Sequence, residues 1–351
     1  MFGSVGVTAV MLTLEAMDVG INTVNKAAMS KGMSRYTLVV YSNFIAVFLL
    51  LFSSFIFYRK RNEPAITFSL ICRIFVLSLL SCCGQVFTNI GIGYSSPTLA
   101  SAMIDLTPAF TFILGVFARM EILNFRMKSS QAKCIGTMVL ITGGLIFTLY
   151  KGPSITGGDD DDDLQKKMIF SSPSNWAIGG FFLSVHSFIL ALIYIVLTWI
   201  IRDYPSELMI TLLNSTMVTV FSASVSLVAE KDPNAWTITP DIQLLSISFT
   251  AVFGVSLRTI VHTWACHKKG PVYTCMFKPL GMVIAVFMGV SFLGDNLYLG
   301  SVIGGGTIGI GFYGVMWGKS REDKESCGFE SSSLKAPLLR NKFLKFIPFL
   351  H

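Results

Sequence analysis

Charged and amide side chains interrupt several long apolar runs in this sequence, where polar residues are unusual. Glu15, Asp18 and Asn22 are spaced by three and four residues, so they share one face of a helix. Gln85 and Asn89 are spaced in the same way. A charge at the centre of a bilayer costs at least about 2.5 kcal/mol, so such residues usually mark the path of a solute or a proton. We predict that Asn22, Gln85 and Asn89 contact a solute.

Two further charged residues each lie beside a proline. Asp105 and Thr107 come just before Pro108, and Lys278 directly precedes Pro279. A proline removes a backbone donor and frees the carbonyl one turn earlier, which in a membrane helix is satisfied by neighbours or by a wet cavity. We predict that Asp105, Thr107 and Lys278 bind a solute and that both prolines act in gating. Kinks needed only for packing are the alternative.

The two proline-containing stretches are copies of one pattern. Pro97 precedes Glu121 by the same number of residues as Pro271 precedes Asp295. The chain is therefore interpreted as two copies of one membrane unit with a polar site between them. In that arrangement Asp105 and Lys278 lie roughly 8 Å apart along the membrane normal, close enough to hold one solute between them.

The remaining charged residues in apolar runs leave alternatives open. Glu15 and Asp18 are the other partners that Lys278 could have, in a structural ion pair or at a solute site. They are also candidates for proton coupling, together with His262. Arg258 lies one turn before His262 and either contacts the solute or pairs with an acid.

Composition sets the class of protein that must position these residues. Hydrophobic residues make up 52% of the chain and charged residues only 13%. The apolar residues are arranged in runs of roughly 20, the length of a helix that spans a bilayer. The net charge of +7 is better explained by basic cytoplasmic loops than by nucleic-acid binding. The seven cysteines lack metal-ligand spacing, so neither a metal site nor a disulfide framework is expected.

We predict an all-α polytopic membrane protein with ten transmembrane helices. Five spans per half is an odd number, so tandem copies must have opposite orientations in the membrane, a common plan for secondary transporters. The predicted spans are Val5 to Lys26, Tyr36 to Tyr58, Cys72 to Ile92, Thr98 to Ala118, Ala132 to Tyr150, Trp176 to Ile201, Leu208 to Val228, Leu244 to Trp264, Pro271 to Phe292 and Tyr298 to Trp317.

Loops and glycines complete the expected organisation. The bias of Lys and Arg toward one set of loops predicts that both termini are cytoplasmic. Residues 1–150 form the first repeat, 151–174 an acidic linker, 175–318 the second repeat and 319–351 a disordered tail. Glycines in the fifth and tenth spans, spaced by four residues in the tenth, predict close helix packing. These glycines are Gly136, Gly300, Gly304, Gly305 and Gly309.

The sequence lacks the common catalytic and nucleotide-binding motifs. It contains no His-Glu-x-x-His, no Gly-x-Ser-x-Gly and no phosphate-binding Gly-x-x-x-x-Gly-Lys-Ser/Thr. We therefore expect neither an enzyme nor an ATP-driven pump, and no cofactor.

Several short motifs resemble one plant family. They are Gly20-Ile21-Asn22-Thr23, Lys31-Gly32-Met33-Ser34, Tyr94-Ser95-Ser96-Pro97-Thr98-Leu99-Ala100-Ser101-Ala102, Leu106-Thr107-Pro108-Ala109-Phe110, Lys269-Gly270-Pro271-Val272-Tyr273, Phe277-Lys278-Pro279-Leu280 and Gly311-Phe312-Tyr313-Gly314-Val315-Met316-Trp317-Gly318-Lys319. The sequence is similar in these stretches to the nodulin-21-like, walls-are-thin-related EamA transporters of the drug/metabolite transporter superfamily.

The resemblance implies two inverted five-helix EamA repeats that move amino acids, or auxin and related metabolites, across a plant membrane. It implies a small-molecule partner such as an amino acid or an indole acid, a lipid bilayer and no nucleic acid, and it leaves a homodimer open. The membrane is expected to be the plasma membrane or the vacuolar membrane. A transport-inactive scaffold or receptor with the same fold is the alternative.

Overall fold

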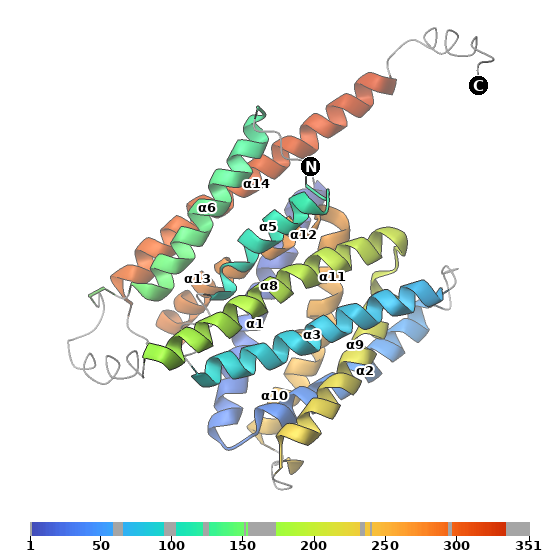
Figure 1. The fold of residues 1–351 in the computed structure, drawn as a ribbon, viewed down its shortest axis with the longest axis vertical. Coiled ribbons are helices and arrows are strands. Elements are labelled where there is room, and N and C mark those ends of the chain that lie inside the picture. Colours follow the sequence, from blue (N-terminus) through green and yellow to red (C-terminus); the bar gives the residue numbers. More distant parts are fainter. Residues whose placement is uncertain are drawn as a thin grey trace.

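The computed structural model describes residues 2–58, 66–94, 103–121, 126–150, 152–153, 173–231, 236–238, 241–293 and 297–334. The elements in these ranges are all helices (Figure 1). Nine helices of this part are long and apolar enough to cross a membrane, and Thr107–Phe117 is a shorter apolar helix. The predicted class, an all-α multi-pass membrane protein, is confirmed, and the expected ten spans agree with this set. The Asp159–Asp163 run lies outside the described residues.

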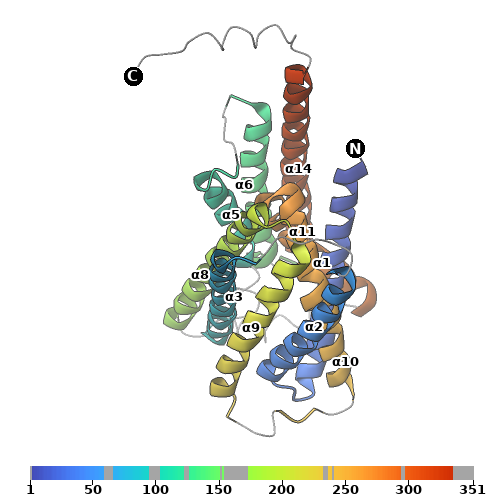
Figure 2. The same cartoon turned by 90° about the vertical axis from the view of Figure 1, so that its right-hand side faces the viewer.

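The first half contains α1 to α6 and the second half α8 to α14. The helices of the first half are α1 (Phe2–Ser30), α2 (Arg35–Tyr58), α3 (Phe68–Tyr94), α5 (Thr107–Phe117) and α6 (Lys128–Leu149). Those of the second half are α8 (Pro173–Asp203), α9 (Glu207–Ala229), α10 (Ile242–Phe249), the π-helix η2 (Thr250–Leu257), α11 (Arg258–Lys269), α12 (Pro271–Cys275), α13 (Lys278–Met288), the π-helix η3 (Gly289–Leu293) and α14 (Leu299–Leu334). The start of α1 and the far end of α14 lie at the same end of the bundle (Figure 2).

Both proline-containing spans are broken helices. In the first, a turn at Asp105 and Leu106 precedes α5, and in the second a turn at Met276 and Phe277 separates α12 from α13. The residue before each inner helix has nearly the same backbone conformation, φ −76° and ψ −13° at Leu106 against φ −75° and ψ −17° at Phe277. Each inner helix then has 11 residues with proline in its first turn. This geometry supports an internal repeat in which Thr107, and not Asp105, is the counterpart of Lys278.

Helices α6 and α14 pack along a seam where glycines bring the two backbones together (Figure 1). A Cβ atom on Gly136 would lie 2.7 Å from the backbone nitrogen of Val315. A Cβ atom on Gly304 would lie 2.5 Å from the Cα atom of Phe147. Neither site has room for a side chain, so both glycines are needed for this close approach.

The spacing of the seam differs from the predicted one. The glycines of α14 that leave no room for a Cβ atom beside α6 are Gly304, Gly311 and Gly318, seven residues apart. Gly314 would make only an ordinary contact, 3.4 Å from the Gly136 Cα atom, and Gly309 has no atom within 4 Å of its Cβ position. Gly305 would make only an ordinary contact, 3.7 Å from Val283, and Gly300 is buried. The four-residue pattern is therefore corrected to a seven-residue pattern, because nearly parallel helices meet again after about two turns.

A cluster of four charges, which we call the end cluster, joins α5, α6 and α14. The Lys133 Nζ atom lies 2.8 Å from Glu121 Oε2 and 2.9 Å from Glu322 Oε2. The Lys319 Nζ atom lies 2.8 Å from the other Glu121 oxygen. The side chains of Lys133 and Glu121 are both 2% exposed. This buried network fixes the end of the α6–α14 seam against the turn that follows α5.

The turn after α5 presents Glu121 to this cluster. Arg119 has a φ of +54°, in the left-handed region, and the N–H groups of Met120 and Glu121 both donate to the Gly115 carbonyl. Burial alone would raise the pKa of Glu121, but the charges of Lys319 and Lys133 outweigh it and hold the pKa below its usual value. Glu121 is therefore ionised when both lysines are in place.

Helix α14 also differs from the prediction. It continues past the expected end of the last span at Trp317 as far as Leu334, although residues 319–351 were expected to be disordered. Lys319 and Glu322 bond to the end cluster, which stabilises the first turn of this continuation. Residues 335–351 lie outside the described part of the chain.

Candidate functional site

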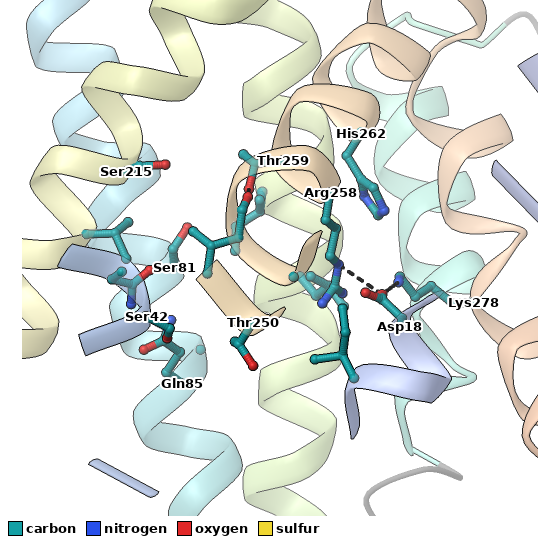
Figure 3. Close-up of a pocket in the computed structure, with 18 of the residues that line it drawn as sticks. Asp18, Ser42, Ser81, Gln85, Ser215, Thr250, Arg258, Thr259, His262 and Lys278 are labelled. Carbon is teal, nitrogen blue, oxygen red and sulfur yellow. Dashed lines mark hydrogen bonds and ion pairs between the residues drawn. The ribbon is translucent and has the colours of Figure 1, made fainter. Parts of the chain in front are cut away.

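A cavity of about 750 Å³ lies among helices of both halves. Helices α1, α2 and α3 of the first half and α8, α9, η2, α11 and α13 of the second half all line it. In Figure 3, Ser42 and Gln85 lie across the cavity from Asp18 and Lys278. Its volume lies within the usual range of about 300–1,000 Å³ for small-molecule sites. The walls are rich in amides and hydroxyls, namely Asn22, Asn25, Ser42, Asn43, Ser81, Gln85, Thr211, Asn214, Ser215, Thr250, Thr259 and Thr263.

Four charges, which we call the cavity cluster, occupy one wall. Lys278 Nζ on α13 lies 3.0 Å from Glu15 Oε1 on α1. Arg258 Nε on α11 lies 3.2 Å from Asp18 Oδ2, and Lys278 Nζ is 3.9 Å from the same oxygen (Figure 3). Two acids face two bases, so the wall is neutral overall. Its members come from the first and the last parts of the chain.

Arg258 is the member of this cluster that the cavity reaches best. Its side chain is 41% exposed, and this exposure is to the cavity that it lines, whereas that of Lys278 is only 9% exposed. The ion pair with Asp18 is made through Nε, which leaves the terminal guanidinium nitrogens for another acceptor. A guanidinium fork binds a carboxylate through two parallel hydrogen bonds. The wall can therefore hold a carboxylate at Arg258.

A histidine above this wall has an unused nitrogen. His262 is 7% exposed, its ring is stacked on Tyr194, and its Nδ1 atom lies 3.2 Å from the Tyr194 hydroxyl. In Figure 3 the ring extends toward Arg258 and Lys278. Its Nε2 atom has no hydrogen-bond partner among the described residues. Buried polar atoms are nearly always paired, so this nitrogen is a candidate for a solute or proton contact.

A π-helix positions Arg258. The η2 segment lies in the middle of the predicted eighth span, and Thr250, Gly254 and Val255 of this segment line the cavity. The Asn25 side-chain oxygen accepts a hydrogen bond from Thr250 Oγ1 at 2.9 Å, which joins η2 to α1. Arg258 follows η2 directly. Short π-helical segments are rare and frequently occur at functional sites.

Comparison with known proteins decides the family. The EamA-like transporter family model matches residues 7–149. The WAT1-related protein At3g28050 of Arabidopsis thaliana is 44% identical over 351 residues, 95% of each chain. Its relative At5g40210 is also 44% identical, over 94% of each chain. The chain belongs to the WAT1-related EamA family. It is thus an integral multi-pass protein of a plant family of membrane transporters.

A solved structure supports the fold of this WAT1-related chain. The crystal structure of another protein superposes with a TM-score of 0.66 at 11% identity. The match covers 92% of the WAT1-related chain and 99% of the other. At this identity the likeness concerns the fold alone.

In this WAT1-related protein, several predicted site residues lie together in the cavity. Those that line it are Glu15, Asp18, Asn22, Gln85, His262 and Lys278. The Asn89 side chain lies outside what the structure describes. Pro108 and Pro279 are buried in the first turns of α5 and α13. The charged wall therefore contains Lys278 with Glu15 and Asp18, one of the alternatives that the sequence leaves open.

The structure does not bring Asp105 to Lys278. Asp105 and Thr107 are both buried and neither lines the cavity. The Asp105 carboxyl lies over Gly144 of α6 instead. The predicted pair is therefore corrected, because the helix break directs Asp105 toward α6 and the counterpart of Lys278 is Thr107.

The sequence analysis missed the polar lining from Asn25, Asn43 and Asn214. Asn43 and Asn214 are single amides in apolar runs, and Asn25 lies beside Lys26 at the predicted end of the first span. Helical spacing carries a weak signal, since Asn22 and Asn25 are three residues apart and Ser81 and Gln85 are four apart.

Proposed function

We propose that this protein is a secondary transporter or facilitator that moves a small organic solute with a carboxylate group across a plant membrane by alternating access. The observation that carries the proposal is Arg258, which is 41% exposed in a cavity of about 750 Å³ and is bound to Asp18 through Nε. A fixed guanidinium in a water-filled membrane cavity is a typical anchor for an anionic group.

The lining favours an amino acid over an indole acid. Glu15 and Asp18 lie beside Lys278 and Arg258, so an ammonium group and a carboxylate could exchange with the existing ion pairs. The amide and hydroxyl walls suit a polar solute. An indole ring is usually bound by apolar and aromatic walls, and apart from two histidines the cavity has only one aromatic residue, Tyr194, among the described residues that line it.

The floor of the cavity supports alternating access. Leu77, Tyr194, Leu197 and Ile210 line the cavity and belong to a larger apolar cluster of α3, α8, α9, α11 and α12. Farther along the same helices Arg73 pairs with Asp203 and lies over the Trp199 ring. An apolar layer with an ion pair beyond it closes the cavity on this side, and it must open in the second state of a transport cycle.

A flux panel tests the proposal. The wild type and the Arg258→Lys variant are reconstituted in separate vesicles. The vesicles are loaded with labelled amino acids or indole acids, and the efflux of label is compared. We expect an amino acid to move, and we expect Arg258→Lys to lose flux by at least about tenfold because a lysine lacks the guanidinium fork. Lys31→Gln is the matched control, because Lys31 pairs with Asp241 at the surface.

The outcomes separate the two functional hypotheses. Wild-type flux from Arg258→Lys would remove Arg258 from the solute site. Solute binding by the purified wild-type protein without any flux would favour the receptor or scaffold.

A further inference from the structure

Asp105 is a buried carboxyl group that the solute cavity does not use. It lies at the helix break of the first repeat and is 1% exposed. Its Oδ2 atom has no hydrogen-bond partner among the described residues, and the hydroxyl of Thr107 in the same turn also has none. Buried polar groups are almost always satisfied, so two orphan oxygens at one break require an explanation.

Among the described residues, no group of opposite charge pairs with Asp105. On α6 the carboxyl lies against Gly144, and on α8 the Ser187 hydroxyl donates to the Met103 carbonyl at 2.5 Å. The titratable groups on the packed helices bind elsewhere. Lys133 on α6 pairs with Glu121, His186 on α8 contacts the Gly84 carbonyl at 3.0 Å, and Cys275 on α12 contacts the Val272 carbonyl at 3.1 Å.

The space around the carboxyl limits what can bind there. A Cβ atom on Gly144 would lie 2.5 Å from Asp105 Oδ2 and 2.8 Å from Asp105 Cγ, so not even a methyl group fits between them. A solute or a hydrated ion therefore does not fit between the carboxyl group and α6. A proton needs no room, and it removes the charge whose burial without a partner is so unfavourable.

We propose that Asp105 is a proton-binding site, separate from the solute cavity, that couples proton movement to the solute transport proposed above. The inference rests on that proposed function. Ile104, the residue before Asp105, lines the cavity, so a shift of the helix break reaches both sites. In the second state of the cycle such a shift brings the carboxyl group to water, where it releases its proton. The equivalent place in the second broken helix holds Met276, so this arrangement is present in one repeat only.

The sequence-based candidates for this role are placed differently. Glu15 and Asp18 are each paired with a cation in the cavity wall. His262 is stacked on Tyr194 and lines the same cavity. Asp105, by contrast, has no ion-pair partner among the described residues and lies outside the cavity lining.

The first experiment separates coupling from solute movement. Wild type and Asp105→Asn are reconstituted in vesicles, and solute exchange at equal pH is compared with uptake under an imposed pH gradient. We expect the gradient to accelerate wild-type uptake. We expect Asp105→Asn to bind the solute with a Kd within about threefold of wild type and to show no response to the gradient. A wild type that exchanges solute but ignores the gradient, or an Asp105→Asn variant that responds as wild type does, would overturn the proposal.

A second measurement does not depend on the variant folding. A hydrophobic carbodiimide modifies protonated carboxyl groups in apolar surroundings, and mass spectrometry locates the label in the wild-type protein. We expect label on Asp105 at about pH 6, where an ordinary aspartate is ionised, and less label as the pH rises. Absence of label on Asp105 at this pH would overturn the proton site. A wild type that moves no solute but is labelled at Asp105 would refute the transport function and leave the proton site standing.

Discussion

The cavity cluster and the end cluster each contain two acids and two bases, yet they use their bonds differently. In the end cluster Lys133 reaches two glutamates and Glu121 reaches two lysines, and both side chains are buried. In the cavity cluster Arg258 meets Asp18 through one nitrogen and keeps 41% of its side chain exposed. Lys133 and Glu121 therefore each have two partners of opposite charge and almost no exposure, whereas Arg258 has one such partner and a partly exposed side chain.

This difference in bonding distinguishes a cluster that holds helices together from a cluster that can bind a solute. A buried network in which each central charge has two partners fixes helices relative to one another. Loss of one member leaves a buried charge without that partner. A cluster with unused donors beside a cavity can exchange one of its bonds for a bond to a solute. Variants in the end cluster should therefore mainly lose folding stability, whereas variants in the cavity cluster should mainly lose transport.

The largest effect is expected at the end cluster. Glu121→Gln removes the charge that holds both lysines, and it should lower the free energy of unfolding by about 3 kcal/mol, because breaking a buried pair leaves its partner uncompensated. Thermal unfolding of the purified protein and its abundance in the membrane measure this loss. The double variant Glu121→Leu with Lys133→Met should recover part of it, and no recovery would show that the pair is not the cause.

The next largest effect is expected at Gly318, where α14 packs closely against α6 beside the end cluster. A Cβ atom on Gly318 would lie 2.8 Å from the Ser129 carbonyl oxygen and 3.0 Å from Lys133 Cγ. Gly318→Ala should therefore destabilise the protein by about 1–3 kcal/mol. Gly309→Ala is the matched control on the same helix, since no atom lies within 4 Å, and it should be neutral or stabilising by up to about 1 kcal/mol. Equal melting temperatures for the two variants would contradict the seven-residue seam.

The cavity cluster should respond mainly in transport. Lys278→Gln leaves Glu15 without its partner, so it should reduce flux by about tenfold or more and also lower the amount of folded protein. Adding Glu15→Gln removes the stranded charge, so abundance should return while flux does not. If flux returns along with abundance, the pair is structural and Lys278 has no part in solute movement.

The smallest effect is a pH dependence confined to the end cluster. The pKa of Glu121 is held below its ordinary value of 4.5, so its stabilising charge is present above that value and is lost as the pH falls through the lowered pKa. The difference in melting temperature between wild type and Glu121→Gln should be full at neutral pH and should shrink in acid below about pH 4.5. A difference that stays constant to strong acid would show that Glu121 carries no charge in the folded protein.

Hydrophobic runs and the charges within them were sufficient to predict the helices and the charged wall of the cavity. Glu15, Asp18 and Lys278 stand out because charges are rare in apolar spans, and the structure brings them into one wall. The partner of Lys278 was ranked wrongly because the alignment started from Pro97 and Pro271. The helix break, where Pro108 and Pro279 lie in matching first turns, supports a different alignment of the two predicted repeats.

Other features had no signal in the sequence. The end cluster joins Glu121 to Lys133 and Lys319, charges that lie at the ends of predicted spans, where charges are ordinary. The π-helix η2 cannot be seen in hydrophobic periodicity, because over eight residues a π turn and an α turn produce nearly the same apolar run. The amides of the cavity wall are single polar residues whose facing depends on helix rotation.

The π-helix also fixes the phase of the helix that follows it. Each residue of an α-helix advances the rotation by about 100°, and a π turn accommodates one residue more than an α turn. The Ser256 hydroxyl donates to the Ala251 carbonyl five residues earlier, at 2.8 Å, in keeping with the wider turn. If Thr250–Leu257 closed as an ordinary α-helix with all its residues, α11 would rotate by about 100° relative to the helix before it, and Arg258 would turn away from the cavity. Deleting one residue from the segment at the same time would restore the present facing of Arg258 relative to the Thr250–Asn25 contact.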